Sequence, residues 1–390
     1  MRKKLEDYRK NKVEYLKEIS IEVLEEFCER DNLTSIVQDQ FDDIDFCLLK
    51  LRSLVPRIIA ADANLMESVK RDRAMATFEK DTYTKLFRIC HKLQGKLNLF
   101  HIERIREFEF DFNDLQGWNP MSAIASGSFA DVYHASLRRR DDVVQIALKV
   151  FREHVTPDTV NDYLTEETAL RKLASPYVVE FHGSAFSTKP RKQLAMAFEL
   201  CVGLKDFIFS FDDRIPAKHE PCTKSREIAF NFMKDFSKQL TRALAFVHEK
   251  GFIHRDMKID NILVDNQNRV KLADLGLTKR DQDITHSFVG SVYYMPPEML
   301  TAKKYNYKAD IYSLGLIFWE MWYGEYAYED EDSSMLEFIN KIKDNYRPDL
   351  KKPNQPSYDM CELIKRCWHQ DPDRRPTAPE CLEAVERVKD

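Results

Sequence analysis

One segment constrains this chain more than any other: FIHRDMKIDNILVD, residues 252–265. Within it, Asp256 is followed five residues later by Asn261 and then by two apolar residues. A second segment, VKLADLGL (270–277), places Asp274 18 residues after Asp256. The tripeptides His-Arg-Asp and Asp-Leu-Gly are each short enough to occur by chance on a surface. Their combination in this order and at this spacing indicates that the two carboxylates and the amide serve one function.

Charged residues upstream fall into the same frame. Lys149 lies in the β-like run QIALKVF (145–151), and Glu166 lies in a helical stretch seven residues before Leu173. The adjacent Glu167 is the alternative acidic residue. A single lysine or glutamate is most often a solvated surface charge. The flanking β-branched residues and the shared frame favour a functional pair instead.

Together these segments resemble the eukaryotic protein kinase family, from about residue 118 to the end of the chain. They match its H-R-D-x-x-x-x-N catalytic loop, its D-F-G segment with leucine in place of phenylalanine, and its V-A-I-K strand. The resemblance implies that Asp256 orients the substrate hydroxyl and accepts its proton. It also implies that Asn261 and Asp274 hold Mg²⁺, and that Lys149, paired with Glu166, binds the α- and β-phosphates of ATP.

Carried over position by position, the resemblance implies three sets of site residues, with ATP and Mg²⁺ as cofactors. The catalytic set is Asp256, Lys258 and Asn261. The metal ligands are Asn261 and Asp274. The nucleotide-binding set is Ile124, Ala125, Ser126, Gly127, Ser128, Phe129, Ala130, Asp131, Val132, Ala147, Lys149, Glu166, Glu199, Cys201 and Leu263.

The glycine-rich loop departs most from the family pattern. In IASGSFADVYHA (124–135) only Gly127 remains of three glycines, and Ala125 and Ala130 replace the other two. Alanine is strained where φ is positive and takes up space where phosphate approaches the backbone closely. Glycine at both positions is therefore expected to tighten ATP binding, unless the loop already has φ values that alanine can adopt.

Further segments resemble structural parts of the family. GSVYYMPPE (290–298) resembles the end of the activation segment, with Ser291 in the threonine position. Arg375 is expected to form an ion pair with Glu298, and Asp310 is expected to brace the catalytic loop. Phe198 is expected to be the gatekeeper. The apolar spine is expected to consist of Phe181, Leu170, Leu275 and His254.

Two features bear on which hydroxyl is phosphorylated. Lys258, two residues after Asp256, and Ser291 are typical of serine/threonine kinases. The segment CWHQDPDRRPT (367–377) is commoner in tyrosine kinases and in the tyrosine-kinase-like branch. The combination resembles the tyrosine-kinase-like serine/threonine kinases, a group that includes mixed-lineage and receptor-interacting kinases. Dual specificity stays open.

The activation segment offers candidate phosphorylation sites. LTKRDQDITHSFVG (277–290) contains Thr285 and Ser287, with Thr278 as a weaker candidate. A phosphate carries a charge of about −1.5 to −2 and could pair with Arg255, which would order the loop. The alternative is a solvated polar loop.

Residues 1–112 have a different texture. They contain one glycine, Gly95, and one proline, Pro56. Their apolar residues recur every three or four positions, which is typical of amphipathic helices that pack together. We expect a small antiparallel bundle that regulates or localises the kinase through a protein partner or a second copy of the chain. The alternative is a passive appendage.

The expected fold class is thus α+β: a bilobal protein kinase domain over 118–390, with a β-rich N-lobe and a helical C-lobe, preceded by the all-α module 1–112. A net charge of −5 excludes a bulk attraction to nucleic acid. Eight cysteines without a CxxC pair indicate reduced thiols and a cytoplasmic protein. No apolar run reaches the roughly 20 residues of a membrane span. A pseudokinase scaffold that signals through the helical module, and a small-molecule kinase, are the alternatives.

Overall fold

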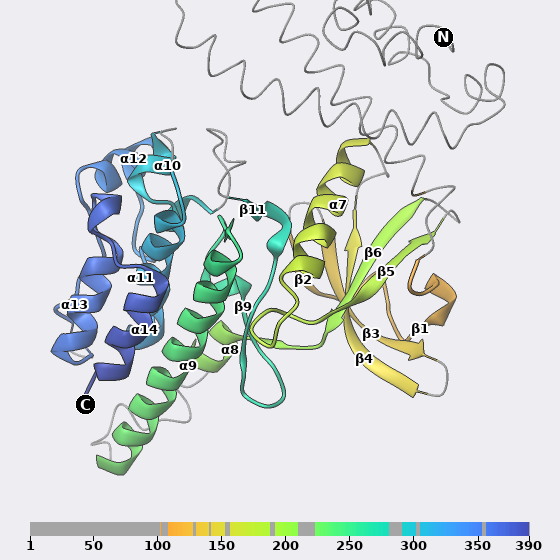
Figure 1. Ribbon diagram of the computed structural model, residues 1–390, viewed down its shortest axis with the longest axis horizontal. Coiled ribbons are helices and arrows are strands. Elements are labelled where there is room, and N and C mark those ends of the chain that lie inside the picture. The colour runs from red at the N-terminus through yellow and green to blue at the C-terminus, as the bar shows by residue number, and fades with distance from the viewer. Residues whose placement is uncertain are drawn as a thin grey trace, which may run out of the picture. The chain divides into compact units, whose positions relative to one another are not determined.

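The structure is a computed structural model of the 390-residue chain (Figure 1). It describes residues 102, 108–127, 130–139, 142–152, 157–187, 192–209, 223–280, 291–301, 305–352 and 356–389. Most of the expected helical bundle over residues 1–112 lies outside these ranges, so the bundle stays a prediction. Among the described residues, no helix combines the length and apolar character that crossing a membrane requires.

The chain divides into two compact units. The smaller comprises 1–111, 151–163 and 185–194, and the larger comprises 112–150, 164–184 and 195–390. In the described part of the smaller unit, Ile102 and Phe110 are buried. The ring of Phe108 stacks on that of Phe186 with 5.9 Å between their centres. The chain is therefore already packed several residues before residue 112.

Six strands form one sheet in the order β1-β3-β4-β6-β5, with β2 paired to β3. They are β1 (Leu115–Gln116), β2 (Ala123–Ser126), β3 (Ala130–Arg139), β4 (Asp142–Phe151), β5 (Phe181–Ser187) and β6 (Gln193–Glu199). Side chains alternate between the two faces of a strand. In β4 this alternation buries Ile146, Leu148 and Val150, and it turns Ala147 and Lys149 to the opposite face.

The helix α7 (Pro157–Lys172) follows β4 in the chain. It begins with a proline, whose fixed φ and missing N–H suit the first turn of a helix. Leu170 in the C-terminal half of α7 is buried, and so is Leu173, the residue that follows the helix. The same half carries two consecutive buried glutamates, Glu166 and Glu167.

The C-terminal part of the chain is helical (Figure 1). Its helices are α8 (Leu204–Phe209), α9 (Thr223–Glu249), α10 (Pro297–Leu300), α11 (Lys308–Tyr323), α12 (Met335–Lys343), α13 (Tyr358–Cys367) and α14 (Ala378–Arg387). Every residue of α11 except Lys308 and Trp322 is buried, as expected of a central helix. At Gly315 a Cβ would lie 2.8 Å from the Cβ of Cys367, so only glycine lets α11 approach the end of α13 this closely.

A short hairpin joins the two motif segments, 252–265 and 270–277. β9 (Ile262–Val264) pairs antiparallel with β10 (Val270–Leu272), and β7 (Val202–Gly203) pairs with β9. Ile262 is the register partner of Leu272, so the residues just before β9 and just after β10 leave the hairpin at the same end. A second pair joins β8 (Phe252–Ile253) to β11 (Lys279–Arg280). A sheet followed by helices confirms the α+β class expected for this part of the chain, β-rich in its N-terminal half and helical in its C-terminal half.

Candidate functional site

The carboxylate of Asp256 is held by residues of the loop before β9 and by Ser291, the residue just before η6 (Val292–Tyr294). The backbone N–H of Ser291 donates to Oδ1 at 3.0 Å, and Nζ of Lys258 lies 2.9 Å from Oδ2. Nδ2 of Asn261 donates to the backbone oxygen of Asp256 at 2.8 Å and to Oδ2 at 3.1 Å. Lys258 also donates to Oγ of Ser291 at 3.2 Å. The network holds one carboxylate in place, as a group that accepts a proton from a positioned substrate requires.

The residues before Asp256 are held by Asp310 of α11. Arg255 has a φ of 71°, a left-handed conformation that costs a non-glycine residue roughly 1–2 kcal/mol. Asp310 accepts hydrogen bonds from the backbone N–H groups of His254 (2.8 Å) and Arg255 (2.9 Å). Burial raises the pKa of Asp310, but the hydrogen bond with His248 and the charges of the two histidines lower it overall. These contacts confirm that Asp310 braces the loop.

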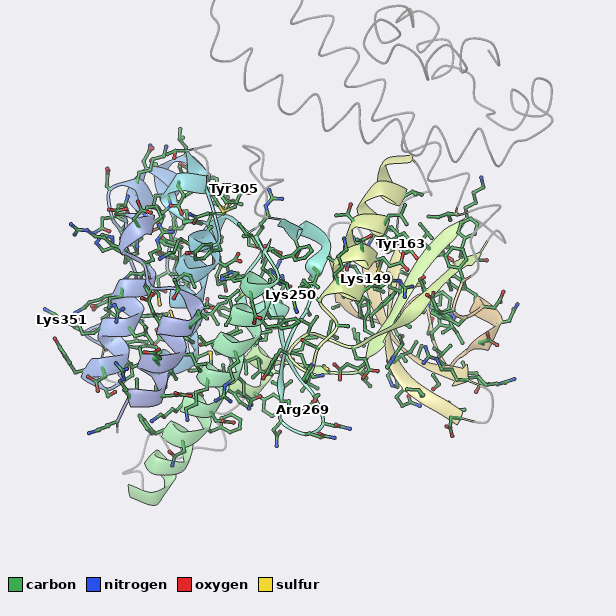
Figure 2. All side chains as sticks on the ribbon, viewed as in Figure 1. Lys149, Tyr163, Lys250, Arg269, Tyr305 and Lys351 are labelled. Carbon is green, nitrogen blue, oxygen red and sulfur yellow. The ribbon has the colours of Figure 1, made fainter. Side chains whose placement is uncertain are left out.

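Lys149, labelled in Figure 2, meets two carboxylates from other elements. Its Nζ lies 2.6 Å from Oε1 of Glu166 and 3.3 Å from Oδ1 of Asp274. Burial lowers the pKa of Lys149, but the two carboxylates raise it well above its ordinary value. Lys149 in turn lowers the pKa of Asp274, whose side chain is 46% exposed. The lysine is therefore a fixed cation beside an accessible carboxylate, which suits a polyanionic ligand.

The β9–β10 hairpin brings together the two residues proposed as metal ligands. Asn261 precedes β9, Asp274 follows β10, and the backbone N–H of Ala273 donates to the oxygen of Asn261 at 2.9 Å. Because Nδ2 of Asn261 is bound to Asp256, Oδ1 is the atom left to face a cation. Within the described ranges, no group of three or more His, Cys, Asp or Glu side chains could hold a metal. Two oxygen ligands suit Mg²⁺, which binds one or two protein groups together with substrate phosphates.

The described part of the glycine-rich loop tolerates its alanines. Gly127 donates its N–H to the oxygen of Ala130 at 2.9 Å, and Oγ of Ser126 donates to Asp131 at 2.7 Å. Neither Ala125 nor Ala130 has a positive φ. The strain expected of alanine in this loop is therefore absent at both positions. Ser128 and Phe129 lie outside the described residues.

Other residues of the expected nucleotide-binding set come from β2, β3, β4, β6 and β9 and from the segment after β6. Val132, Ala147 and Leu263 are half-buried, and Ile124 of β2 is largely exposed. Phe198 of β6 is buried, and its ring centre lies 5.7 Å from that of Phe181. Burial, with the charge of Glu199, raises the pKa of Cys201 to about 12, so this thiol is not a nucleophile at neutral pH.

The structural supports expected from the resemblance are present. Arg375 donates to both carboxylate oxygens of Glu298, at 2.6 and 2.9 Å, and both side chains are buried. The predicted ion pair is therefore confirmed. Among the residues of the expected spine, Leu170, Leu275 and His254 are buried.

Several buried contacts near the site were not predicted. Glu320 of α11 accepts from the Tyr294 hydroxyl at 2.8 and 2.9 Å, and burial raises the pKa of Glu320 to about 8. Lys271 of β10 lies 2.6 Å from Oε1 of Glu199, at the end of β6. No spacing along the chain signals either contact, because each joins elements far apart in sequence.

Comparison with known proteins agrees with this geometry. Residues 118–385 match the family model described as a protein kinase domain. A probable serine/threonine-protein kinase of Dictyostelium discoideum is 30% identical over 287 residues, covering 72% of this chain and 29% of that protein. The serine/threonine-protein kinase STY46 of Arabidopsis thaliana is 28% identical over 268 residues, covering 68% and 43%. The dual specificity protein kinase shkA of D. discoideum is 29% identical over 277 residues, covering 68% and 48%. The chain spans less than half the length of these three relatives.

Proposed function

The chain belongs to the protein kinase family, and on that premise we propose that it transfers the γ-phosphate of ATP to serine and threonine hydroxyls of proteins. The observation that carries the proposal is the network of Asp256, Lys258 and Ser291, in which a lysine and a hydroxyl flank the carboxylate. The relatives named as serine/threonine kinases support the same class of substrate. The relative named as a dual specificity kinase keeps tyrosine open.

Each residue has a role in this proposal. Asp256 accepts the proton of the substrate hydroxyl. At the same time the hydroxyl oxygen forms a bond to the γ-phosphorus, and the bond between that phosphorus and the leaving oxygen of ADP breaks. Lys258 offsets negative charge beside Asp256, and Lys149 binds the phosphates. Asn261 and Asp274 would hold Mg²⁺, which would offset negative charge on the phosphates of ATP.

A transfer assay with radiolabelled ATP and generic protein substrates tests the proposal. The full chain should produce phosphoserine and phosphothreonine, and Asp256→Asn should abolish both. Asp373→Asn, at an exposed position in η7 (Pro372–Arg374), is the matched control and should keep full activity. A wild-type chain without transfer, or an Asp256→Asn chain as active as the control, would overturn the proposal.

We further propose that residues 1–112 form a helical module that regulates the kinase or pairs two copies of it, and that the protein works in the cytoplasm. The apolar periodicity of these residues and the packing of Phe108 on Phe186 support the module. A shortened chain that begins near residue 107 keeps this contact and removes most of the module. If its oligomeric state and its activity across dilution equal those of the full chain, the regulatory proposal fails.

Phosphorylation of the activation segment is a separate proposal. Thr285 and Ser287 lie outside the described residues. The side chain of Thr278 is buried, which disfavours it as an acceptor. Arg255, the residue expected to pair with the phosphate, donates through its Nε to the hydroxyl of Tyr305 at 2.6 Å. Mass spectrometry of the active protein should find phosphate on Thr285 or Ser287, and full activity without either would remove the idea.

A further inference from the structure

Two consecutive carboxylates of α7 face different strands. Oε1 of Glu166 lies 2.6 Å from Nζ of Lys149, on β4. Oε1 of Glu167 accepts from Oγ of Ser184, on β5, at 3.4 Å and from Nη2 of Arg171, one turn along α7, at 2.8 Å. Consecutive residues of an α-helix point about 100° apart around its axis. The two side chains therefore fix the helix from two directions.

Glu167 is buried, and a buried carboxylate is costly unless it is paired and hydrogen-bonded. Its partner Arg171 also donates through Nε at 3.3 Å, and the Arg171 side chain remains 47% exposed. The guanidinium carbon of Arg171 lies 5.1 Å from the ring centre of Phe181 on β5. The ring of Phe181 in turn packs against Phe198 of β6. Glu167 is thus linked through Arg171 to the strand behind the nucleotide-binding residues.

A second glutamate–arginine pair in the chain shows what is unusual here. Glu383 and Arg387 of α14 have the same spacing of four residues and lie 3.1 Å apart, but their side chains are 65% and 78% exposed. An exposed pair of this kind stabilises a helix only slightly. The Glu167–Arg171 pair differs in that its carboxylate is buried against β5, where it contacts a residue of another element.

We propose that Glu167 is a positioning residue that sets the rotation of α7 about its own axis, so that Glu166 meets Lys149. The geometry makes the site sensitive to this rotation. A side chain about 5 Å from the helix axis moves about 3 Å when the helix turns by about 30°. Such a shift would separate Glu166 from Lys149. The proposal deepens the kinase function proposed above and rests on it.

Kinetics of the full chain provide the first test. Glu167→Ala should lower kcat/KM for ATP by about tenfold or more, since misplacement by about 1 Å can cost on the order of a hundredfold. Glu167→Gln keeps an oxygen that can accept from Arg171 and Ser184, so it should stay within about threefold of wild type. Arg171→Ala should act in the direction of Glu167→Ala. Glu383→Ala is the matched control and should change nothing.

A second readout separates positioning from loss of stability and does not depend on phosphotransfer. An adenosine that carries a lysine-reactive sulfonyl fluoride modifies the amine of Lys149, and its rate can be measured at saturation and at one fixed pH. If Glu167 holds Glu166 in place, Glu167→Ala displaces the carboxylate that lies 2.6 Å from Nζ of Lys149, and the labelling rate rises above that of the wild type. Glu167→Gln should lie close to wild type.

The outcomes are distinct. A labelling rate of Glu167→Ala and Arg171→Ala that equals that of Glu383→Ala overturns the proposal, even if Glu167→Ala melts earlier. If Glu167→Ala does not fold, Arg171→Ala decides, because its half-exposed side chain can be removed with less disturbance. If the wild type fails to transfer phosphate while Glu167→Ala changes the labelling rate, the proposed function is wrong and the positioning role stands.

Discussion

Removing Arg375 should leave the buried carboxylate of Glu298 without its charged partner. Nη1 and Nη2 of Arg375 donate to the two oxygens of Glu298, and the Arg375 side chain has 0% exposure. Arg375 also donates to the backbone oxygens of His369 at 2.8 Å and Lys308 at 3.0 Å. Breaking a buried pair by removing one partner costs about 3–5 kcal/mol. We therefore expect Arg375→Ala to lower the free energy of unfolding by at least about 3 kcal/mol.

Thermal unfolding followed by circular dichroism measures this loss. At about 2–4 °C per kcal/mol, Tm should fall by roughly 6–20 °C. Arg374→Ala is the matched control, because the Arg374 side chain is 73% exposed and lies 3.9 Å from Asp371. Adding Glu298→Gln to Arg375→Ala should recover part of the loss, since no unpaired charge is then buried. If Arg375→Ala melts within about 2 °C of Arg374→Ala, the reasoning is refuted.

Three other changes have definite expected results. Asp256→Asn should keep nucleotide binding and less than about a tenth of the turnover, as measured by nucleotide titration and transfer rate; greater retention contradicts the general-base role. Glycine at both Ala125 and Ala130 should not tighten ATP binding, because neither has a positive φ, and the added chain entropy should weaken it by up to about 1 kcal/mol per site; calorimetry showing tighter binding contradicts this. Glu320, with its raised pKa, stabilises the fold most below pH 4.5, and this contribution is lost as pH rises through about 8. Between these values, Tm of the wild type should therefore fall relative to Glu320→Gln, and parallel profiles contradict the assignment.

Chain spacing was enough to predict the parts of the site that lie close in sequence. Asn261 and Asp274 flank one hairpin, so pairing between β9 and β10 brings them together. The expected pair of Lys149 with Glu166 is also present, although the sequence left Glu167 open as an alternative. Which of two adjacent glutamates meets Lys149 on β4 depends on how the helix is rotated, and packing decides this rotation. Helical periodicity alone does not contain that information.

The sequence motifs could not predict contacts between buried polar residues of elements that lie far apart in the chain. Tyr294 and Glu320 are 26 residues apart, and Glu199 and Lys271 are 72 apart. Charged residues at such positions usually lie on the surface, so a pattern-based reading assigns them to solvent. Their burial follows from where α11 and β10 lie in the fold. Whether the alanines of the glycine-rich loop are strained was left open by the sequence for a related reason, since backbone φ values depend on the pairing of β2 with β3.

The β9–β10 hairpin has a consequence for the order in which the site assembles. Asn261 and Asp274 are 13 residues apart, so closing the loop between them costs little entropy, and such local contacts form early in folding. Lys149 and Asp274 are 125 residues apart, so their contact must wait for long-range closure. Asp265 already fastens the turn of the hairpin, because its Oδ1 accepts from the backbone N–H groups of Gln267 and Arg269 at 2.8 and 2.9 Å. The two side chains proposed as metal ligands can therefore come together before Lys149, which is proposed to bind the phosphates, reaches its place.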